Sequence, residues 1–460
     1  MMRALHLERR WSHMYGHVGP VSARTFSATS SSPSPSSSPL PPIRITCYMS
    51  SGVDSLISTY LLSSRHPSTI SSLSSTLNTP IPPSRPLHIH PMYMLNWLDP
   101  STGKFCPSNL RDLETIKSQI TSLRSLPEIN QNKTFHNTTL HDCTLKSYAS
   151  AYYTTVFLPS LTSYSSSLTP NPDTSCNSLI KFNLAKKDCL KESDCIVTGH
   201  YADIVEGRLK ISKDLKKDQT YFLCTTEGDW GETFFPLANW FKNETTTGVR
   251  ALLHDVGLGE YDKKDSTGIC MIPGKNDLSS LIKDFEDELS DADDAEVAEV
   301  NIVLNDEIIG STDSKRDPKY YTIGQRVPLN GYPKKIFMLR RDALNVHVVD
   351  DTKDSRLYSS ILECDSFNWM LDSDKEDYKG KALGRIRHGQ PLIPCTYSRT
   401  KNNGVKVEWE KCLRAVAKGQ VCCLYNEQGF VIGGGVISWT GGEVEGMEKV
   451  KSGDNDKSVA

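Results

Sequence analysis

One stretch near the start of the chain, Ile-Arg-Ile-Thr-Cys-Tyr-Met-Ser-Ser-Gly-Val-Asp-Ser at residues 43–55, constrains the fold more than any other. Its first half is rich in β-favouring residues, which indicates a short buried strand. Small residues follow, and Asp54 is of a type that commonly starts helices. A strand, a tight loop and a helix N-terminus form an anion site, because backbone N–H groups converge there and the helix dipole favours negative charge. The hydroxyls of Ser50, Ser51 and Ser55 would add donors.

The loop contains no lysine, so it is not the G-x-x-x-x-G-K-[ST] loop that grips a transferable γ-phosphate. We interpret it as a cradle for pyrophosphate. It resembles the S-G-G-x-D-S loop of the ATP pyrophosphatase superfamily, whose members cleave ATP to AMP and pyrophosphate. Ser51 stands where that pattern usually has glycine, so we expect a negative φ at Ser51. Read alone, the stretch fits an ordinary Ser-rich turn equally well.

Composition limits the classes of protein that the chain can belong to. The chain has 460 residues, enough for two or three domains with full cores. Its formal net charge of −3 gives no overall attraction to nucleic acid, so an RNA contact would need local patches. No apolar run approaches the roughly 20 residues of a membrane span, and we expect no membrane partner. The 13 cysteines do not suggest a disulfide scaffold, and no C-x-x-C pair indicates a zinc site, so we assign no metal ligands.

Residues 1–42 have the composition of an organelle transit peptide followed by a flexible segment. Four arginines are opposed by a single acid, Glu8, and Ser and Pro dominate from Ser27 onward. No continuous apolar segment suggests secretion. We therefore predict a mitochondrial location, with a plastid as the alternative, because the Ser-rich part fits both.

The central region predicts a Rossmann-like α/β fold. Leu87–Leu95 and Asp194–Thr198 are strand candidates, and a short strand is expected around Thr134. Helical patterns at 55–64, 110–123, 148–158 and 244–256 alternate with these strands, while the Ser/Pro-rich residues 67–86 are expected to form a surface loop. Such alternation argues for a parallel sheet covered on both faces. Ligands of such sheets bind beyond the carboxyl ends of the strands, where the first loop and Gly199-His200 both lie.

Beyond Asn301 the pattern changes to short alternating segments separated by turn residues, which predicts a mainly β C-terminal part ending in a small barrel. The expected strands are 301–309, 335–339, 346–349, 381–386, 405–410, 420–425 and 430–437. The acidic residues 284–299 are expected to form a solvated helix face or loop. The predicted domains are a transit peptide at 1–42, a catalytic domain at 43–275, a connector domain at 276–355, a β-barrel at 356–440 and a polar tail at 441–460.

Two cysteines lie in settings that suggest reactivity. Two prolines stiffen the approach to Cys176, and Asn171 and Asp173 can cap the helix that follows. Cys176 is expected in the first turn of that helix, where the dipole favours an accessible thiolate. Cys270 follows two lysines and a flexible Ser-Thr-Gly run. Two such cysteines on separate loops could exchange sulfur across a cleft, although each taken alone is better explained as a buried core residue.

Five further motifs occur in a fixed order along the chain: T-P-N-P-D-x-x-C-N-x-x-I-K-F from Thr169, T-G-H-Y from Thr198, K-D-Q-x-Y-F-L from Lys217, K-K-D-S-T-G-I-C from Lys263 and Y-T-I-G-Q-R from Tyr321. Together with the first loop they closely resemble the tRNA-specific 2-thiouridylase family. The resemblance runs from about Ile43 to Ile437, and several long motifs in one order are far more specific than a single loop. It implies an ATP pyrophosphatase-type catalytic domain, a connector and a C-terminal β-barrel.

The resemblance also implies roles for individual residues. It places ATP binding on the first loop and two further residues: Tyr48, Met49, Ser50, Ser51, Gly52, Val53, Asp54, Ser55, Met94 and Gly199. The target base would meet Asn171, Pro172 and Asp173, with Asp173 as the acid/base, and the catalytic cysteines would be Cys176 and Cys270, which form a transient disulfide. Contacts with tRNA would fall on His200, Lys217, Asp218, Gln219, Arg385, Ile386 and Gln420. Ile386 departs from the family, which usually has tyrosine there.

The implied reaction is the thiolation of the wobble uridine of tRNA. ATP, with Mg²⁺ on its phosphates, adenylates the C2 oxygen, and Cys270 carries sulfur as a persulfide. Attack by Cys176 releases that sulfur to the activated carbon and leaves a disulfide that must be reduced. The base must leave the anticodon stack of the tRNA stem-loop to reach the cleft. The implied partners are tRNA and a persulfide donor, and we expect a monomer.

Two rival readings remain open from the sequence. An amidotransferase-type or tRNA-lysidine-type ligase would use the same Ser50–Ser55 loop, but it gives no reason for Cys176 and Cys270. An RNA-binding or sulfur-carrier protein that lost turnover is the second rival, and Ser51 and Ile386 are the features that favour it.

Overall fold

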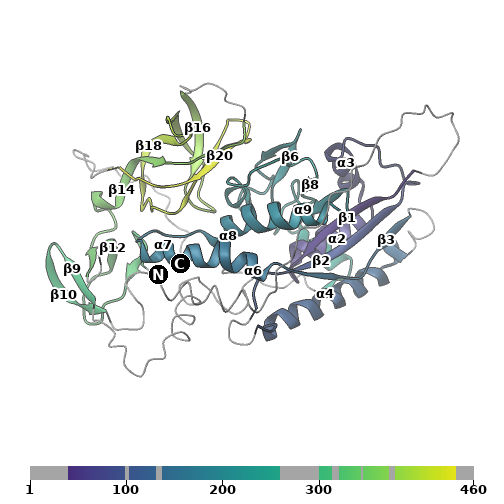
Figure 1. The fold of residues 1–460 in the computed structure, drawn as a ribbon, viewed down its shortest axis with the longest axis horizontal. Coiled ribbons are helices and arrows are strands. Elements are labelled where there is room, and N and C mark those ends of the chain that lie inside the picture. The colour runs from purple at the N-terminus through teal and green to yellow at the C-terminus, as the bar shows by residue number, and fades with distance from the viewer. Residues whose placement is uncertain are drawn as a thin grey trace. The chain divides into compact units, whose positions relative to one another are not determined.

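The computed structural model describes residues 40–98, 103–130, 137–259, 300–312, 321–342, 345–371 and 379–441 (Figure 1). These residues divide into two compact units. The first contains the described residues up to Pro159 and those from Pro172 to 259, and the second contains Ser160–Asn171 and those from 300 onward. The predicted transit peptide lies outside the described residues except for its last three positions.

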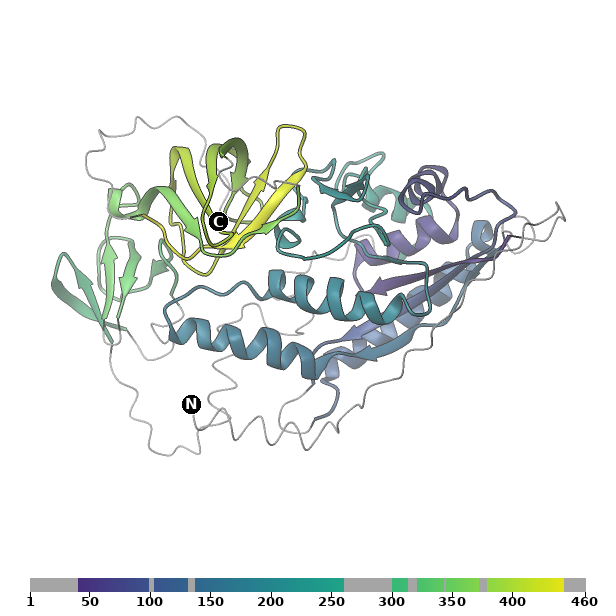
Figure 2. The same cartoon turned by 45° about the horizontal axis from the view of Figure 1, so that its top comes forward.

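The first unit is built on a six-stranded sheet in which every strand pair is parallel (Figure 2). Its strands are β1 (Ile43–Met49), β2 (Leu87–Leu95), β3 (Thr138–Leu140), β4 (Thr144–Ser147), β5 (Cys195–Val197) and β8 (Thr233–Phe234). Their order is β3-β2-β1-β5-β8, and β4 also pairs with β2. This confirms the predicted Rossmann-like class. The chain leaves β1 toward β2 on one side and β5 lies on the other, which makes the carboxyl end of β1 a topological switch point.

Helices cover both faces of this sheet. The helices of the first unit are α2 (Val53–Ser63), α3 (Pro67–Thr76), α4 (Pro107–Ser125), α6 (Ala149–Tyr152), η1 (Tyr153–Phe157), α8 (Pro172–Ser175), η2 (Cys176–Ala185), α9 (Lys186–Cys189), η3 (Thr220–Phe222) and α10 (Val249–Asp255), whereas α7 (Leu158–Ser165) begins at the end of the first unit and lies mostly in the second. Ile43, Ile45 and their alternate neighbours on β1 share a core with α2, α4 and α10. The opposite side chains face the other way, since Met92 on β2 contacts Cys189 of α9. A short hairpin, β6 (Asp203–Val205) and β7 (Arg208–Lys210), follows β5.

The first half of the expected surface loop at 67–86 is instead a helix, α3. Pro67 occupies the first helical turn, where its missing N–H costs nothing. Thr69 and Leu73 are buried, and Leu73 belongs to the core of the first unit. The abundance of serine concealed this amphipathic segment.

The second unit contains two separate β-sheets with separate cores. The smaller sheet has the order β10-β9-β13-β12-β11, from strands β9 (Val300–Leu304), β10 (Glu307–Thr312), β11 (Arg326–Val327), β12 (Ile336–Arg341) and β13 (Asn345–Val349). The single strand expected at 301–309 is wrong, because β9 and β10 form a hairpin there. Asn305 and Asp306 both have positive φ, 49° and 66°, as a tight two-residue turn requires.

The larger sheet has the order β14-β18-β17-β16-β19-β20-β15. Its strands are β14 (Tyr358–Cys364), β15 (Asn368–Trp369), β16 (Lys379–Arg385), β17 (Ile393–Arg399), β18 (Val405–Arg414), β19 (Val421–Tyr425) and β20 (Val431–Val436), and the turn η6 (Ser355–Leu357) precedes them. A bridge between Glu363 and Trp439 joins β14 to the chain that follows β20, so the sheet curls back on itself. This confirms the predicted C-terminal β-barrel class. The exact domain limits at 275 and 355 remain predictions.

Within the described ranges, no helix combines the length and the apolar character that crossing a lipid bilayer requires.

Candidate active site

The loop after β1 is held by side chains of α4. Ser51 has φ +49°, so the expectation of a negative φ there is wrong. The Ser51 hydroxyl donates a hydrogen bond to Asp112 Oδ1 at 2.8 Å, and Gln119 Nε2 donates to the Ser51 carbonyl at 3.1 Å. A left-handed conformation costs a non-glycine residue about 1–2 kcal/mol. These two bonds, one of them to a carboxylate, offset that cost.

The start of α2 is arranged as an anion site. Gly52 is the N-cap residue, and no described side chain caps the helix at that position. Ser50 is exposed, whereas the buried Ser55 hydroxyl accepts from the Ser50 N–H at 3.2 Å and donates to the Gly52 carbonyl at 3.0 Å. An uncapped helix N-terminus beside an exposed hydroxyl fits a phosphate group.

A buried lysine that the sequence did not single out compensates the acid of this loop. Lys242 Nζ lies 2.8 Å from Asp54 Oδ2, and the Tyr201 hydroxyl donates to Asp54 Oδ1 at 3.1 Å. The Lys242 side chain is only 8% exposed. The Asp54 carboxylate is therefore paired within the protein and does not oppose an anion at the loop. Lys242 lies in no recognised motif and reaches Asp54 from 188 residues away, so only the fold reveals it.

The end of β5 packs directly against the first turn of α2. A Cβ added at Gly199 would lie 2.7 Å from the Asp54 carbonyl carbon and 2.8 Å from Ser55 N. Only glycine permits this approach without a shift of the backbone. The structure therefore brings Gly199 and the Ser50–Ser55 loop together, as the sequence predicted.

His200, the next residue, lies half-buried between aromatic rings. Its Nδ1 is 2.6 Å from Thr198 Oγ1, and its ring centroid lies 5.5 Å from that of Phe182. Burial, and next the positive charge of Lys181, lower the pKa of His200 well below its ordinary value of 6.5. His200 is therefore neutral at physiological pH and would offer a neutral imidazole to any ligand.

Cys176 opens the π-helical segment η2, one turn beyond the start of α8. Its thiol is not on the surface, since the residue is only 2% exposed, so the expected first-turn, accessible position is corrected. The buried amide of Asn96 donates a hydrogen bond to Cys176 Sγ at 3.5 Å. Asn96 follows the carboxyl end of β2, and a polar residue at that place is the sequence signal that would have identified it. A donor to sulfur favours the thiolate form.

Several residues predicted to bind ATP have side chains that pack inside the first unit. Met94 and Val53 are buried, and Met49 Sδ accepts a hydrogen bond from Thr59 Oγ1 at 3.1 Å. Burial raises the pKa of Tyr48, whose hydroxyl lies near Cys189 on α9. These residues would therefore contact a nucleotide through their backbone atoms. Their role in ATP binding stays a prediction.

The Lys217-Asp218-Gln219 segment includes residues that hold the fold. Asp218 is buried, and its carboxylate accepts from the Ser212 N–H at 2.9 Å and from Thr220 Oγ1 at 2.6 Å. Gln219 Oε1 accepts from the Tyr201 N–H at 3.0 Å. Direct contact of the Asp218 side chain with tRNA does not fit this arrangement. The side chains of Lys217 and Gln219 are half-buried, so their predicted contact with tRNA is compatible with the structure.

In the second unit, Asn171 and Gln420 lie together although 249 residues separate them, with Asn171 Nδ2 donating to Gln420 Oε1 at 3.5 Å. Arg385 is buried and donates from Nε to the Tyr425 hydroxyl at 2.9 Å. Ile386 is buried as well, in the barrel core. Side-chain contacts of Arg385 and Ile386 with tRNA therefore do not fit the structure, because neither side chain is available at the surface.

Pro172 is buried and Asp173 half-buried in the first turn of α8, as expected for a turn that begins a helix. Cys270 and the acidic residues 284–299 lie outside the described residues. The predicted Cys176–Cys270 disulfide is therefore untested.

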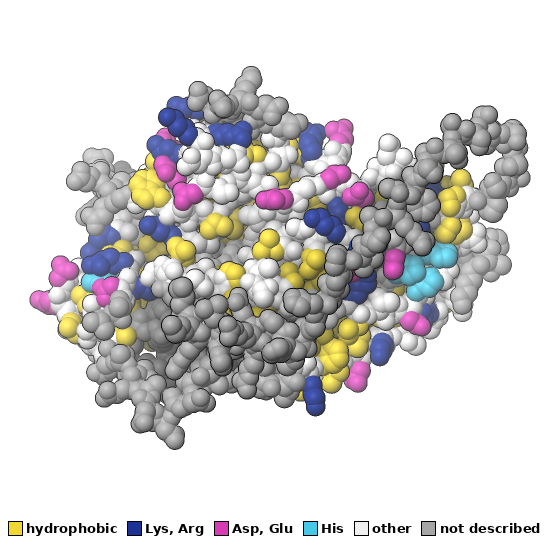
Figure 3. Space-filling view, in the orientation of Figure 1, with side chains coloured by type: hydrophobic (Ala, Val, Ile, Leu, Met, Phe, Trp, Pro, Cys, Tyr) yellow, Lys and Arg dark blue, Asp and Glu magenta, His cyan; other side chains and the backbone are white. Residues whose placement is uncertain are grey.

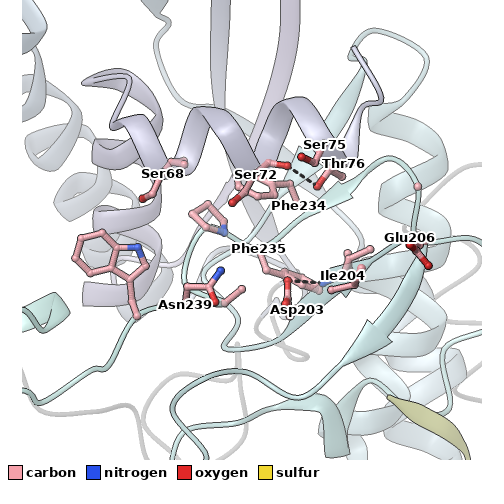
Figure 4. Close-up of a pocket in the computed structure, with 17 residues that line it drawn as sticks. Ser68, Ser72, Ser75, Thr76, Asp203, Ile204, Glu206, Phe234, Phe235 and Asn239 are labelled. Carbon is pink, nitrogen blue, oxygen red and sulfur yellow. Dashed lines mark hydrogen bonds between the residues drawn. The ribbon is translucent and has the colours of Figure 1, made fainter. Parts of the chain in front are cut away.

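A pocket of about 390 Å³ lies elsewhere in the first unit, between α3, the β6–β7 hairpin and residues 231–240 (Figure 4). Ser72 and Thr76 of α3 line one side, and Asp203 and Ile204 line another. None of the predicted site residues lines this pocket.

The fold and the site define a protein with two parts: an α/β domain with a Ser-rich loop at a helix start and a buried cysteine, and a β-barrel. The sequence model of the tRNA methyl transferase HUP domain matches residues 129–274, and that of the aminomethyltransferase β-barrel domain matches residues 359–437. A "tRNA-specific 2-thiouridylase MnmA" of Malacoplasma penetrans is 34% identical over 300 residues, 62% of this chain and 76% of the relative.

Two further relatives extend the similarity. The protein of Chlamydia trachomatis that is also named "tRNA-specific 2-thiouridylase MnmA" is 29% identical over 403 residues, 85% of this chain and 96% of the relative. A "Mitochondrial tRNA-specific 2-thiouridylase 1" of Schizosaccharomyces pombe is 27% identical over 416 residues, 85% of this chain and 89% of the relative. The chain belongs to the tRNA-specific 2-thiouridylase family.

Proposed function

We propose that this protein is an ATP-dependent sulfurtransferase that converts the wobble uridine of tRNA to 2-thiouridine. Its relatives are named tRNA-specific 2-thiouridylases. The observation that carries the proposal is the set of groups at the carboxyl edge of the parallel sheet. The Ser50–Ser55 loop follows β1, Asn96 with its bond to Cys176 follows β2, and Gly199 follows β5. An anion site and a thiol held by a donor are what this chemistry requires.

ATP would be held through its phosphates at the start of α2, by the exposed Ser50 and the N–H groups of the first helical turn. Pairing of Asp54 with Lys242 supports this placement, since it removes an uncompensated negative charge from the loop. When bound, with Mg²⁺ on its phosphates, ATP supplies the adenylyl group that turns the uridine C2 oxygen into part of a good leaving group. The half-buried Asp173 would exchange protons with the base.

Sulfur transfer would use two cysteines of this chain. The Cys176 thiolate attacks the Cys270 sulfur of a Cys270 persulfide, forms the Cys176–Cys270 disulfide and expels hydrosulfide. The hydrosulfide attacks C2 of the activated uridine, and AMP leaves. A thiol reductant then returns both cysteines to thiols. The Asn96 amide would stabilise the Cys176 thiolate before its attack.

The proposed location is the mitochondrion. The composition of residues 1–42 and the mitochondrial relative of Schizosaccharomyces pombe support it. The proposed partners are tRNA and a donor of persulfide sulfur.

The test is reconstitution with purified protein, ATP, Mg²⁺, a thiol reductant, a persulfide donor and an unmodified tRNA transcript. We expect pyrophosphate release and 2-thiouridine in the tRNA by mass spectrometry. Cys176→Ser should abolish 2-thiouridine. Cys189→Ser is the matched control, since Cys189 closes the same run of helix with the same 2% exposure. Thiolation that persists in Cys176→Ser would contradict the two-cysteine route, and absence of both products with wild-type protein would contradict the function.

A further inference from the structure

Three histidines gather on the first unit, away from the residues considered so far. His88 and His90 belong to β2, and His141 lies between β3 and β4. One nitrogen from each ring can be chosen so that all three lie within 4.8 Å of one another. The rings of His90 and His141 are stacked at 4.1 Å between centroids, and His88 lies 5.4 Å from His141. Histidine side chains form a cluster on the surface in Figure 3.

The backbone fixes this cluster on both sides. His88 and His90 are two residues apart on one strand and therefore project to the same face, while Leu87 and Ile89, which alternate with them, enter the core. The edge strand next to β2 is interrupted: β3 pairs with Leu87–Ile89 and β4 pairs with Met92–Leu95. His141 lies at the interruption, and its N–H donates to the Ile89 carbonyl at 2.9 Å.

The three imidazoles have ring nitrogens to spare for a ligand. Among the hydrogen bonds and ion pairs of the described residues, none uses a ring nitrogen of the three, and His141 Nε2 is buried without a hydrogen-bond partner.

The charges around the cluster come in both signs. Arg44 and Glu192 act on His90, and Arg124 and Asp142 act on His141. Arg124 is itself paired with Asp142 at 2.7 Å. The positive charge of Arg124 is therefore compensated by Asp142, and the negative charge of Glu192 acts against that of Arg44 at His90.

We propose that His88, His90 and His141 bind a divalent transition-metal ion of the zinc type. Imidazole nitrogens suit Zn²⁺, Ni²⁺ and Cu²⁺, whereas Mg²⁺ and Ca²⁺ require oxygen ligands. Zinc–nitrogen bonds of about 2.0–2.1 Å place two ligand atoms of a tetrahedral ion roughly 3.4 Å apart. The chosen ring nitrogens, which lie within 4.8 Å of one another, would have to move to that spacing when the ion binds. The fourth position of the ion is left to water or an anion.

The ion would tie the interrupted edge of the sheet to β2. It would lie far from the carboxyl end of the strand, since His90 precedes Leu95 by five residues at roughly 3.3 Å each. The site therefore stands apart from the proposed sulfur-transfer chemistry, and its test needs neither ATP nor tRNA.

The test titrates Zn²⁺ into the full chain, purified without a histidine tag, stripped of metal and kept reduced, against a chromophoric chelator. We expect one site in the wild type and a loss of affinity of roughly tenfold or more in His90→Ala and in His141→Ala. His254→Ala is the control, because His254 is an exposed histidine on α10 paired with Asp255. Binding should raise the unfolding midpoint of the wild type and not that of His90→Ala.

Cobalt distinguishes the cluster from the cysteines of the chain. Co²⁺ at the cluster should give visible absorption without the intense near-ultraviolet band of thiolate ligation. A measurement on the wild type alone is independent of how the variants fold: Zn²⁺ should protect His88, His90 and His141 from diethyl pyrocarbonate. Equal affinity in wild type and His90→Ala, a thiolate spectrum, or no protection of the three histidines would overturn the proposal.

Discussion

At the residue scale, Ser51 shows how a departure from a motif is accommodated. Its left-handed φ of +49° costs about 1–2 kcal/mol, and its hydroxyl bond to the partly exposed Asp112 recovers a similar amount. The pyrophosphate-type loop therefore keeps its shape without the usual glycine. Serine at this position therefore fits the loop that we propose binds ATP, and its effect can be measured directly.

Ser51→Gly should change the free energy of unfolding by less than about 1 kcal/mol, because it loses the hydroxyl bond and the strain together. Ser51→Ala keeps the strain and loses the bond, so its unfolding midpoint should fall by about 2–6 °C, for a loss of about 1–2 kcal/mol. Thermal unfolding followed by circular dichroism compares the two variants. A larger loss in Ser51→Gly than in Ser51→Ala would contradict this account of the loop.

Asn96→Ala removes the donor to Cys176 Sγ. Hydrogen bonds to charged groups are worth about 1.5–3 kcal/mol, so the thiolate should react roughly 10- to 100-fold more slowly. The rate of Cys176 alkylation by iodoacetamide, read by peptide mass spectrometry, measures this effect. Release of pyrophosphate with tRNA should remain, since adenylation does not use the thiol. An unchanged alkylation rate would show that the bond does not activate Cys176.

The lowered pKa of His200 predicts that the stability of the fold depends on pH. Its pKa is far below 6.5 in the folded protein, so the unfolded chain takes up a proton near pH 6.5 that the folded chain does not. Stability should therefore fall as the pH decreases below 6.5. In His200→Gln this slope should be smaller, although His66, His90 and His141, whose pKa values burial also lowers, keep part of it. Urea midpoints between pH 5 and 8 test this, and parallel curves for the two proteins would contradict it.

At the element scale, the contact between β5 and α2 holds the candidate site together. A methyl group at Gly199 would overlap the first turn of α2. Gly199→Ala should lower stability by about 1–3 kcal/mol and reduce pyrophosphate release strongly, because it displaces the helix start. Gly259→Ala is the matched control, since a Cβ there meets no atom within 4 Å. Equal activity in the two variants would mean that the approach of β5 to α2 is not needed.

The sequence predicted the limits of helices and strands best where buried apolar residues recur at a regular spacing. The limits of β2 were predicted without error, and those of α2 differ by two residues at the start and one at the end. It was least informative at α3, where serines fill a helix that buries only Thr69 and Leu73. The β9–β10 hairpin was missed because Asn305-Asp306 is a weaker turn signal than Asn-Gly.

Among the site residues, the sequence could place those that follow strands, such as Gly199 and the Ser50–Ser55 loop. It could not reveal Lys242, which meets Asp54 only after the chain has folded. It also could not distinguish an exposed from a buried thiol at Cys176, since both occur at the start of helices. Nor could the sequence show that Arg385 and Ile386 are buried. The barrel strand that carries Arg385 has no simple alternation of polar and apolar residues.

At the scale of the whole molecule, the chain leaves the first unit after Pro159 and returns to it at Pro172. The segment between them packs within the second unit, where the Thr169 N–H donates to the Lys418 carbonyl at 2.8 Å. The Asn171-Pro172-Asp173 turn, the proposed contact of the target base, thus lies at a junction in the chain path. Cys176 follows that turn directly, so one short segment connects base recognition to the thiol.

Loss of the protein should remove a single modification, the 2-thio group of the wobble uridine in organellar tRNA. The most direct measurement is mass spectrometry of tRNA from mitochondria of cells that lack the protein. We expect wobble 2-thiouridine to be absent from that tRNA, to return when the wild-type chain is supplied and not to return with Cys176→Ser. Undiminished 2-thiouridine in the mitochondrial tRNA of those cells would contradict it.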